Sequence, residues 1–153
     1  MTSNISLYTL LLAFVISSCT YEKAPEFAPE YLYNVPGETV IKSIINNKTR
    51  TIALIYGNDQ AQQTARDPLL RPVAGAHYTL VTWKQKTMPQ WYGTNMNGRI
   101  YSVETLKISQ RNKTGFAFNY EFRPGQSYLP SDRRPEKGHR IHFITAQHAA
   151  IFP

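Results

Sequence analysis

The single cysteine of the chain, Cys19, constrains the fold more than any other feature. It follows the uncharged apolar stretch Leu7–Ile16 and the two small residues Ser17 and Ser18. An apolar core of this length is typical of an export signal and too short for a membrane span, which needs about 20 apolar residues. A cysteine directly after it indicates a bacterial lipoprotein signal, in which the thiol is acylated. No thiol then remains for a disulfide, a thiolate metal site or thioether-linked haem.

Two other interpretations of the N-terminal region remain open. Export signals usually begin with positive charge, but Met1–Tyr8 contains no lysine or arginine, so a buried helix with one buried cysteine is an alternative. Asn47–Thr49 and Asn112–Thr114 fit the glycosylation sequon, which would matter only in a eukaryotic secreted protein.

The lipoprotein interpretation divides the chain into three parts. Residues 1–18 form the signal peptide, 19–36 a lipidated N-terminus with a Pro-rich tether, and 37–153 one domain. We expect acylated Cys19 to insert into the lipid bilayer and the domain to face the periplasm of a bacterial cell envelope. Thr20, in place of aspartate after the cysteine, favours the outer membrane over the inner one.

The chain is basic, with 17 Lys and Arg against 10 Asp and Glu, a net charge of +7. Such a surface would attract anionic lipid headgroups, or nucleic acid in principle. Export and the lack of any recognition motif argue against nucleic acid. A solvated basic surface is the simpler interpretation.

Hydrophobic patterning predicts a mainly β (α+β) domain, an antiparallel sheet with one or two short helices. Strands are expected over Arg50–Tyr56, His77–Trp83, Ile100–Ile108 and Phe116–Phe122, with Arg140–Thr145 as a last strand. Thr39–Ile45 fits a strand or a short helix. Asp59 is the expected cap of a helix over Gln60–Arg66, and Met88–Gly98 is predicted to be a loop closed by an Asn-Gly turn.

Two of these strands have informative patterns. His77–Trp83 is apolar on both faces, which predicts a central strand. Phe116–Phe122 alternates, so its four aromatic residues should line one face against a core. Glu104 shares a strand face with Ser102 and Leu106, and we expect both Glu104 and Glu121 to face solvent.

The candidate ligand-binding residues are histidines and aromatic residues. His139, His142 and His148 are candidate haem or metal ligands, but a strand over the first two would point them to opposite faces. No metal site or catalytic residue is assigned, because no triad order, phosphate loop or dinucleotide fingerprint is present. The aromatic residues that would line a pocket, or else pack on the core, are Trp83, Trp91 and Tyr92.

The sequence resembles exported bacterial proteins of the cytochrome P-460 family. The similarity lies in RTIALIYGND (50–59), YTLVTWKQ (78–85), PQWYG (89–93), SVE (102–104) and the terminal IFP (151–153). The resemblance implies a mainly β domain, often a homodimer, that holds c-type haem and in some members oxidises hydroxylamine. Its haem is attached through C-x-x-C-H near the C-terminus.

This chain departs from that pattern, since it has no cysteine after Cys19. Gly138–His142 stands in place of the motif, or Ile141–Thr145 in another register, so c-type haem is not expected. We therefore predict a lipoprotein that has lost covalent haem and binds a small ligand or a partner, with noncovalent haem on His142 left open. The alternatives are a redox enzyme that uses the C-terminal histidines and a structural envelope protein.

Overall fold

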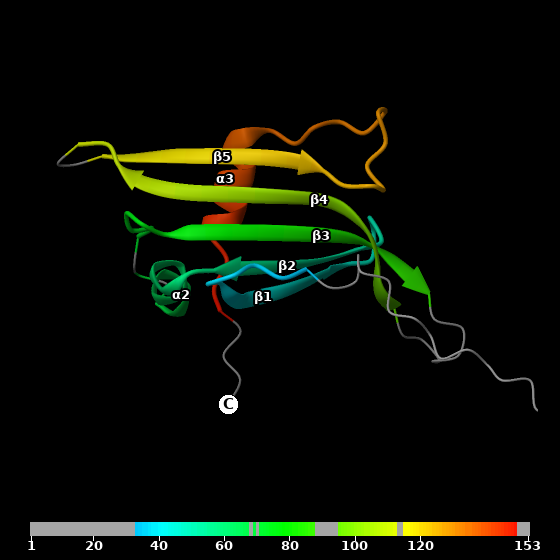
Figure 1. Ribbon diagram of the computed structural model, residues 1–153, viewed down its shortest axis with the longest axis horizontal. Coiled ribbons are helices and arrows are strands. Elements are labelled where there is room, and N and C mark those ends of the chain that lie inside the picture. The colour runs from blue at the N-terminus through cyan, green and yellow to red at the C-terminus, as the bar shows by residue number, and fades with distance from the viewer. Residues whose placement is uncertain (1–32, 68, 70, 88–94, 113–114, 150–153) are drawn as a thin grey trace, which may run out of the picture.

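The computed structural model describes residues 33–67, 69, 71–87, 95–112 and 115–149. Its elements are β1 (Thr39–Asn46), β2 (Thr51–Gly57), α2 (Asp59–Arg66), β3 (His77–Thr87), β4 (Asn95–Gln110), β5 (Phe116–Pro124) and α3 (Lys137–Thr145). The strands form one open sheet in the order β1-β2-β3-β4-β5, and each neighbouring pair is antiparallel (Figure 1). The prediction of a mainly β antiparallel domain with short helices is confirmed.

The central position of β3 is also confirmed. Tyr78 and Leu80 are buried on one face of the sheet, and Val81 and Trp83 on the other. Because β3 pairs with β2 and β4 along its length, its apolar residues are covered on both sides and its backbone on both edges.

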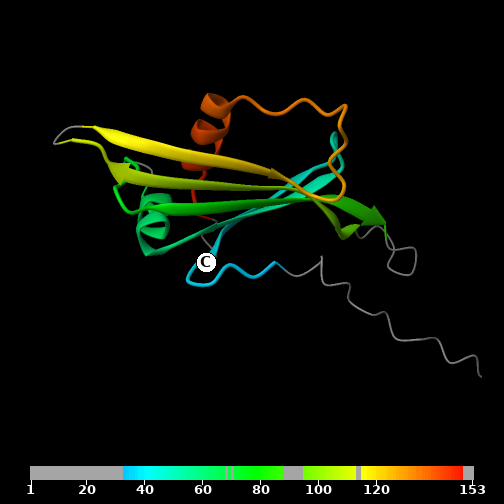
Figure 2. The same ribbon diagram turned by 45° about the horizontal axis from the view of Figure 1, so that its top comes forward.

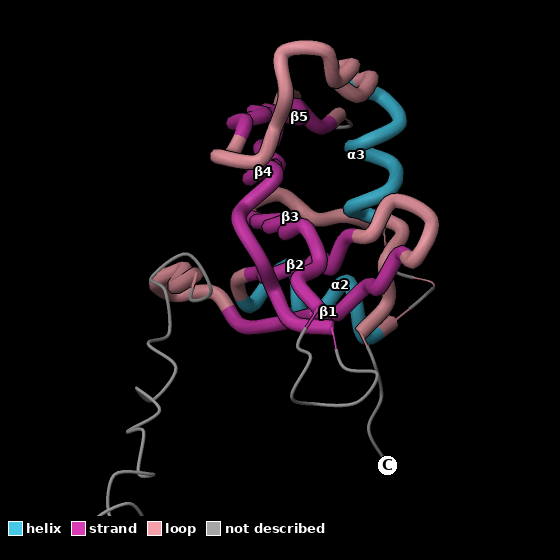
Figure 3. Tube along the Cα trace, turned by 90° about the vertical axis from the view of Figure 1, so that its right-hand side faces the viewer, coloured by secondary structure: helices cyan, strands magenta, loops and turns pink. Residues whose placement is uncertain are grey.

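The two faces of the sheet are covered differently (Figures 2 and 3). On one face, which we call the helix face, Ala61 and Ala65 of α2 and Ile144 of α3 join Ile55 and Leu106 in the main core. On the opposite face a smaller cluster forms around Val81, Trp83 and Val103. Figure 2 shows α3 on one side of the sheet and the first described residues on the other. None of the described helices is long and apolar enough to cross a membrane.

Helix α2 begins one residue earlier than predicted, since its N-cap is Asn58 rather than Asp59. The Asn58 side chain accepts hydrogen bonds from the backbone N–H groups of Ala61 and His77, at 3.1 and 3.0 Å. One side chain thus caps the helix and fastens it to the start of β3.

The predicted strand over Arg140–Thr145 is wrong, because these residues belong to helix α3. Local propensity is weak here, and no side chain caps the N-terminus of the helix. The helical spacing places Arg140, Ile141 and Ile144 toward the sheet, and Ile144 is fully buried. Gln147 donates to the Phe143 carbonyl at the C-terminal end (3.0 Å). Tertiary contacts therefore decide the conformation of this segment.

The predicted aromatic row on β5 is only partly packed. Tyr120 packs against the main core, whereas Phe116 and Phe118 are each 38% exposed. The predicted Asn-Gly turn is wrong, since Asn97 and Gly98 lie within β4. A Cβ at Gly98 would stand 2.7 Å from the Lys84 carbonyl oxygen, so this glycine permits a close approach of β3 and β4.

A β-bulge at Tyr101 shapes the helix face. Thr82 pairs with Ser102, but the next residue, Trp83, pairs with Ile100, which leaves Tyr101 as the extra residue. Ile100 consequently packs with the cluster on the opposite face, whereas Tyr101 and Ser102 both border the helix face. The bulge brings an aromatic ring onto the helix face that strict alternation would place on the other.

Candidate functional site

A cavity of about 380 Å³, open to solvent on one side, lies on the helix face beside α3. The sheet forms its floor, α3 one wall, and the segment between β5 and α3 its rim. Its lining residues are Ile44, Asn46, Thr49, Thr51, Ala53, Leu80, Thr82, Lys84, Tyr101, Ser102, Glu104, Phe122, Arg133, Pro135, Arg140 and Phe143. A second hollow of about 320 Å³ on the opposite face has Arg123 as its only charged lining residue among those described.

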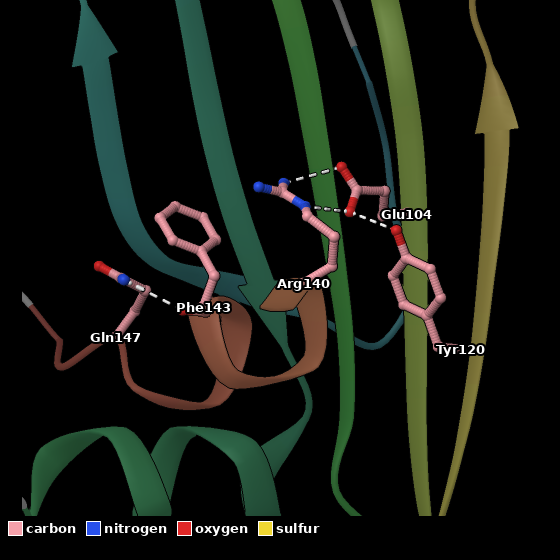
Figure 4. A network of polar contacts seen from close by, with 5 residues as sticks. All are labelled: Glu104, Tyr120, Arg140, Phe143 and Gln147. Atoms are coloured by element: carbon pink, nitrogen blue, oxygen red, sulfur yellow. Dashed lines mark hydrogen bonds and ion pairs between the residues drawn. The ribbon is translucent and has the colours of Figure 1, made fainter. Parts of the chain in front are cut away.

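An ion pair between Glu104 of β4 and Arg140 of α3 joins the floor of the cavity to its wall (Figure 4). Arg140 Nε donates to Glu104 Oε2 at 2.7 Å, and Nη2 donates to Oε1 at 2.8 Å. The Tyr120 hydroxyl donates to the same Oε2 at 2.7 Å. Three donors thus bind this carboxylate, and the arginine–carboxylate contact has the paired geometry of a strong charge-assisted bond.

The expectation that Glu104 faces solvent is wrong, since it is only 2% exposed, whereas Glu121 is exposed as predicted. Burial of a carboxylate is tolerated only when it is paired and hydrogen-bonded. Burial, followed by the hydrogen bond to Glu104 and its negative charge, raises the pKa of the Tyr120 hydroxyl. Burial lowers the pKa of Arg140, but the hydrogen bond and charge of Glu104 outweigh it and the pKa is raised. Arg140 is therefore charged and Tyr120 protonated at neutral pH.

Aromatic rings and cations alternate around the cavity. The Tyr101 and Tyr128 rings lie 5.2 Å apart and the Phe122 and Tyr128 rings 5.4 Å apart, so Tyr128 supports two lining rings from behind. Lys84 Nζ lies 4.3 Å from the centroid of the Tyr101 ring. The guanidinium of Arg140 lies 4.7 Å from the Phe143 ring. Both contacts are cation–π interactions, which orient the cations without neutralising them.

The charge balance of the lining is positive. Lys84, Arg133 and Arg140 are cationic, and Glu104 is the only carboxylate among the described lining residues. Within the described part of the chain, neither Lys84 nor Arg133 forms an ion pair. Asp132 lies outside the lining but close to Tyr101, where burial first and then its charge and hydrogen bond raise the pKa of the Tyr101 hydroxyl.

The three C-terminal histidines do not border the cavity. His139 and His142 lie on α3, so their three-residue spacing is helical, and both are exposed; His148 follows the helix and is also exposed. The His139 imidazole is 85% exposed and lies 3.5 Å from Glu136. Over the described residues, no three or more His, Cys, Asp and Glu side chains are grouped so that they could hold a metal ion.

The fourth histidine, His77, is paired with a carboxylate on the opposite face. His77 Nδ1 lies 2.7 Å from Glu38 Oε1, and the Glu38 side chain is only 3% exposed. Burial raises the pKa of Glu38, against the opposing effects of a hydrogen bond to Thr79 and the charges of His77 and Lys107. This pair fixes the segment that precedes β1 to the start of β3.

Of the predicted pocket residues, the structure describes only Trp83, which does not line the cavity. Trp83 is 1% exposed and packs in the cluster on the opposite face. Trp91, Tyr92 and Cys19 lie outside the described residues.

The cavity does not fit the haem that the family resemblance implies. Its described lining includes no histidine, cysteine or methionine, the side chains that most often bind haem iron. Covalent attachment through C-x-x-C-H is excluded by the sequence, because Cys19 is the only cysteine. No mechanism through haem follows from these residues.

Sequence reasoning missed the side chains that form the cavity. Lys84, Tyr101 and Arg133 carry no motif, and Arg140 was assigned to a strand. The available signals were the basic clusters over 84–86 and 133–140 and the single glutamate in the predicted strand Ile100–Ile108. The chain matches no protein-family model, and no curated protein matches it either.

We predict that Arg140→Met lowers the free energy of unfolding by about 3 kcal/mol, because the Glu104 carboxylate would stay buried without its counter-charge. The double variant Glu104→Leu/Arg140→Met should recover most of that loss. Arg123→Met is the matched control, since the Arg123–Glu121 pair is exposed and long at 3.7 Å, and should change stability by less than about 0.5 kcal/mol. Urea unfolding measures all three. Equal effects of Arg140→Met and Arg123→Met would contradict a structural role for the buried pair.

We also predict that Tyr120 contributes to alkaline instability. Its pKa is higher in the folded than in the unfolded chain, so its contribution is full below about pH 10 and is lost as pH rises above that value. Tyr120→Phe should therefore show a shallower loss of stability between about pH 9 and pH 11. The difference in the free energy of unfolding between the wild type and Tyr120→Phe should be constant from about pH 6 to pH 8, where the Tyr120 hydroxyl is protonated in both the folded and the unfolded chain. Parallel curves across the alkaline range would contradict this assignment.

Proposed function

We propose that this chain is a lipid-anchored protein of the bacterial cell envelope whose domain binds a small ligand in the cavity beside α3. The observation that carries the binding proposal is the cavity itself, which has three cations, three aromatic rings and several hydroxyl groups around one concave surface. Ligand sites in proteins have volumes of about 300–1,000 Å³ and combine apolar walls with a few polar groups. The cavity falls within that range.

The anchoring part of the proposal rests on the sequence. The apolar segment, the small residues and Cys19 precede a tether, and the folded domain begins after it. Acylated Cys19 would insert into the bilayer, most favourably that of the outer membrane, with the domain in the periplasm. The domain would be cytochrome P-460-like but without covalent haem, and a homodimer would be consistent with that family.

We predict that Cys19→Ser abolishes lipidation. Cells fed an alkyne-labelled palmitate should label the wild-type protein but not the variant, and the variant should retain its uncleaved N-terminal segment. Ser17→Ala is the matched control, since it keeps the cysteine and a small residue before it. Labelling that persists in Cys19→Ser would show that another residue carries the lipid.

We predict that the soluble chain Tyr21–Pro153, which contains every described strand and helix, binds the uncharged fluorescent probe phenylnaphthylamine at a single saturable site. Ala53→Phe should abolish this binding, because a ring at this lining position would fill the cavity. Ile45→Phe adds an equivalent ring at an exposed position of β1 and should bind as the wild type does.

Fluorescence titration distinguishes the outcomes of this experiment. Binding that survives in Ala53→Phe, or no saturable binding at all, would contradict the proposal. Circular dichroism of each variant checks that the sheet is intact. An absorption spectrum after addition of haemin tests the redox alternative, since a Soret shift that disappears in His142→Ala would favour a haem enzyme over this proposal.

A further inference from the structure

We propose that the cavity selects an anionic aromatic ligand, whose acidic group lies between Lys84 and Arg133 and whose ring packs on Tyr101 and Phe122. This inference rests on the proposed function, because it names the ligand class of the same cavity. The acidic group could be a carboxylate, sulfonate or phosphate, since all three present the same anionic oxygens to a cation.

The first step concerns the carboxylate. A cationic ligand would be repelled by Lys84, Arg133 and Arg140, and Glu104 is the only carboxylate among the described lining residues that could offset this repulsion. Both of its oxygens already accept strong hydrogen bonds, from Arg140 and Tyr120. At 2% exposure Glu104 could meet a ligand cation only by giving up these bonds. The cavity therefore disfavours cations.

The second step concerns the cations. The Lys84 ammonium lies over the Tyr101 ring. A lysine carries three N–H donors, and the ring contacts the ammonium from one side only, so donors remain for a ligand. Arg140 has five N–H donors and uses two of them in its paired contact with Glu104, and its guanidinium also borders the cavity. Together with Arg133, these groups offer an anion several charge-assisted bonds.

The third step concerns the rings. Tyr101 and Phe122 line the cavity and are both supported by Tyr128, so their positions are fixed before a ligand enters. Phe143 adds a third ring on the α3 side. A small inorganic ion would leave these rings and most of the 380 Å³ unused, whereas a planar organic anion would contact them in offset or edge-to-face geometry. The combination points to an anion that carries a ring.

The test compares two probes that share their rings. Anilinonaphthalene sulfonate carries a negative charge, and phenylnaphthylamine is its uncharged parent. We expect the soluble chain Tyr21–Pro153 to bind the sulfonate about tenfold more tightly than the uncharged probe, because the site holds two cations without ion-pair partners among the described residues. Added salt should reduce this difference in affinity. Lys84→Met should remove about tenfold of sulfonate affinity but less than about twofold for the uncharged probe.

Lys107→Met is the matched control, because Lys107 is an exposed lysine of the same sheet beyond the cavity lining, and it should leave both affinities unchanged. If the two probes bind with equal affinity and Ala53→Phe abolishes the binding of both, the anion preference is overturned, whereas the proposed binding site stands. A tenfold preference that survives in Lys84→Met would overturn the placement of the acidic group. If neither probe binds, the proposed function and this inference both fail.

Discussion

The Glu104–Arg140 pair is the interaction on which the rest of the helix face depends. It is a contact between residues far apart in the sequence, and it joins the middle of β4 to the first turns of α3. Helix α3 has weak local propensity and no side-chain N-cap, so it relies on such contacts and on the burial of Ile144. By holding α3 over one part of the sheet, the pair leaves the neighbouring part open, and the cavity occupies that part.

A second constraint acts on the floor of the cavity. The bulge at Tyr101 turns that ring onto the helix face. Beside the bulge, the residues that follow β5 lie in close contact with β4. Gly125 donates its N–H to the Tyr101 carbonyl at 2.8 Å, and a Cβ at Gly125 would overlap the Ile100 carbonyl group. Glycine is therefore required at the position where β5 ends and the rim begins. The bulge and the glycine together set the distance between the Tyr101 ring and the rim.

The strands were predictable from the sequence because period-two alternation and β-branched residues report directly on a half-buried sheet. This held for β2, β3, β4 and β5, and the apolar faces of His77–Trp83 correctly indicated the central strand. The candidate site was not predictable in the same way. Glu104 looks like a solvent-facing residue until Arg140 is placed opposite it, and that placement requires α3 to be a helix. Because Ile-His-Phe-Ile-Thr fits a strand locally, only tertiary packing reveals the correct conformation. The position of Tyr101 on the helix face was not predictable for another reason, since a single extra residue in a strand reverses the face that a side chain occupies.

The opposite face explains how an anchored domain would keep this cavity accessible. The first described residue, Tyr33, packs with the Trp83 cluster, and its carbonyl accepts a hydrogen bond from the Tyr56 hydroxyl at 3.4 Å. Glu38 is fixed to His77 on the same face. The chain thus enters the fold on the face away from α3, so the sheet itself separates the point of entry from the cavity (Figure 2). On that face the segment before β1 is fixed to β3 by the Glu38–His77 contact, whereas the Glu104–Arg140 pair holds α3 beside the cavity on the other face. The point where the chain enters the fold and the cavity thus depend on two separate contacts, one on each face.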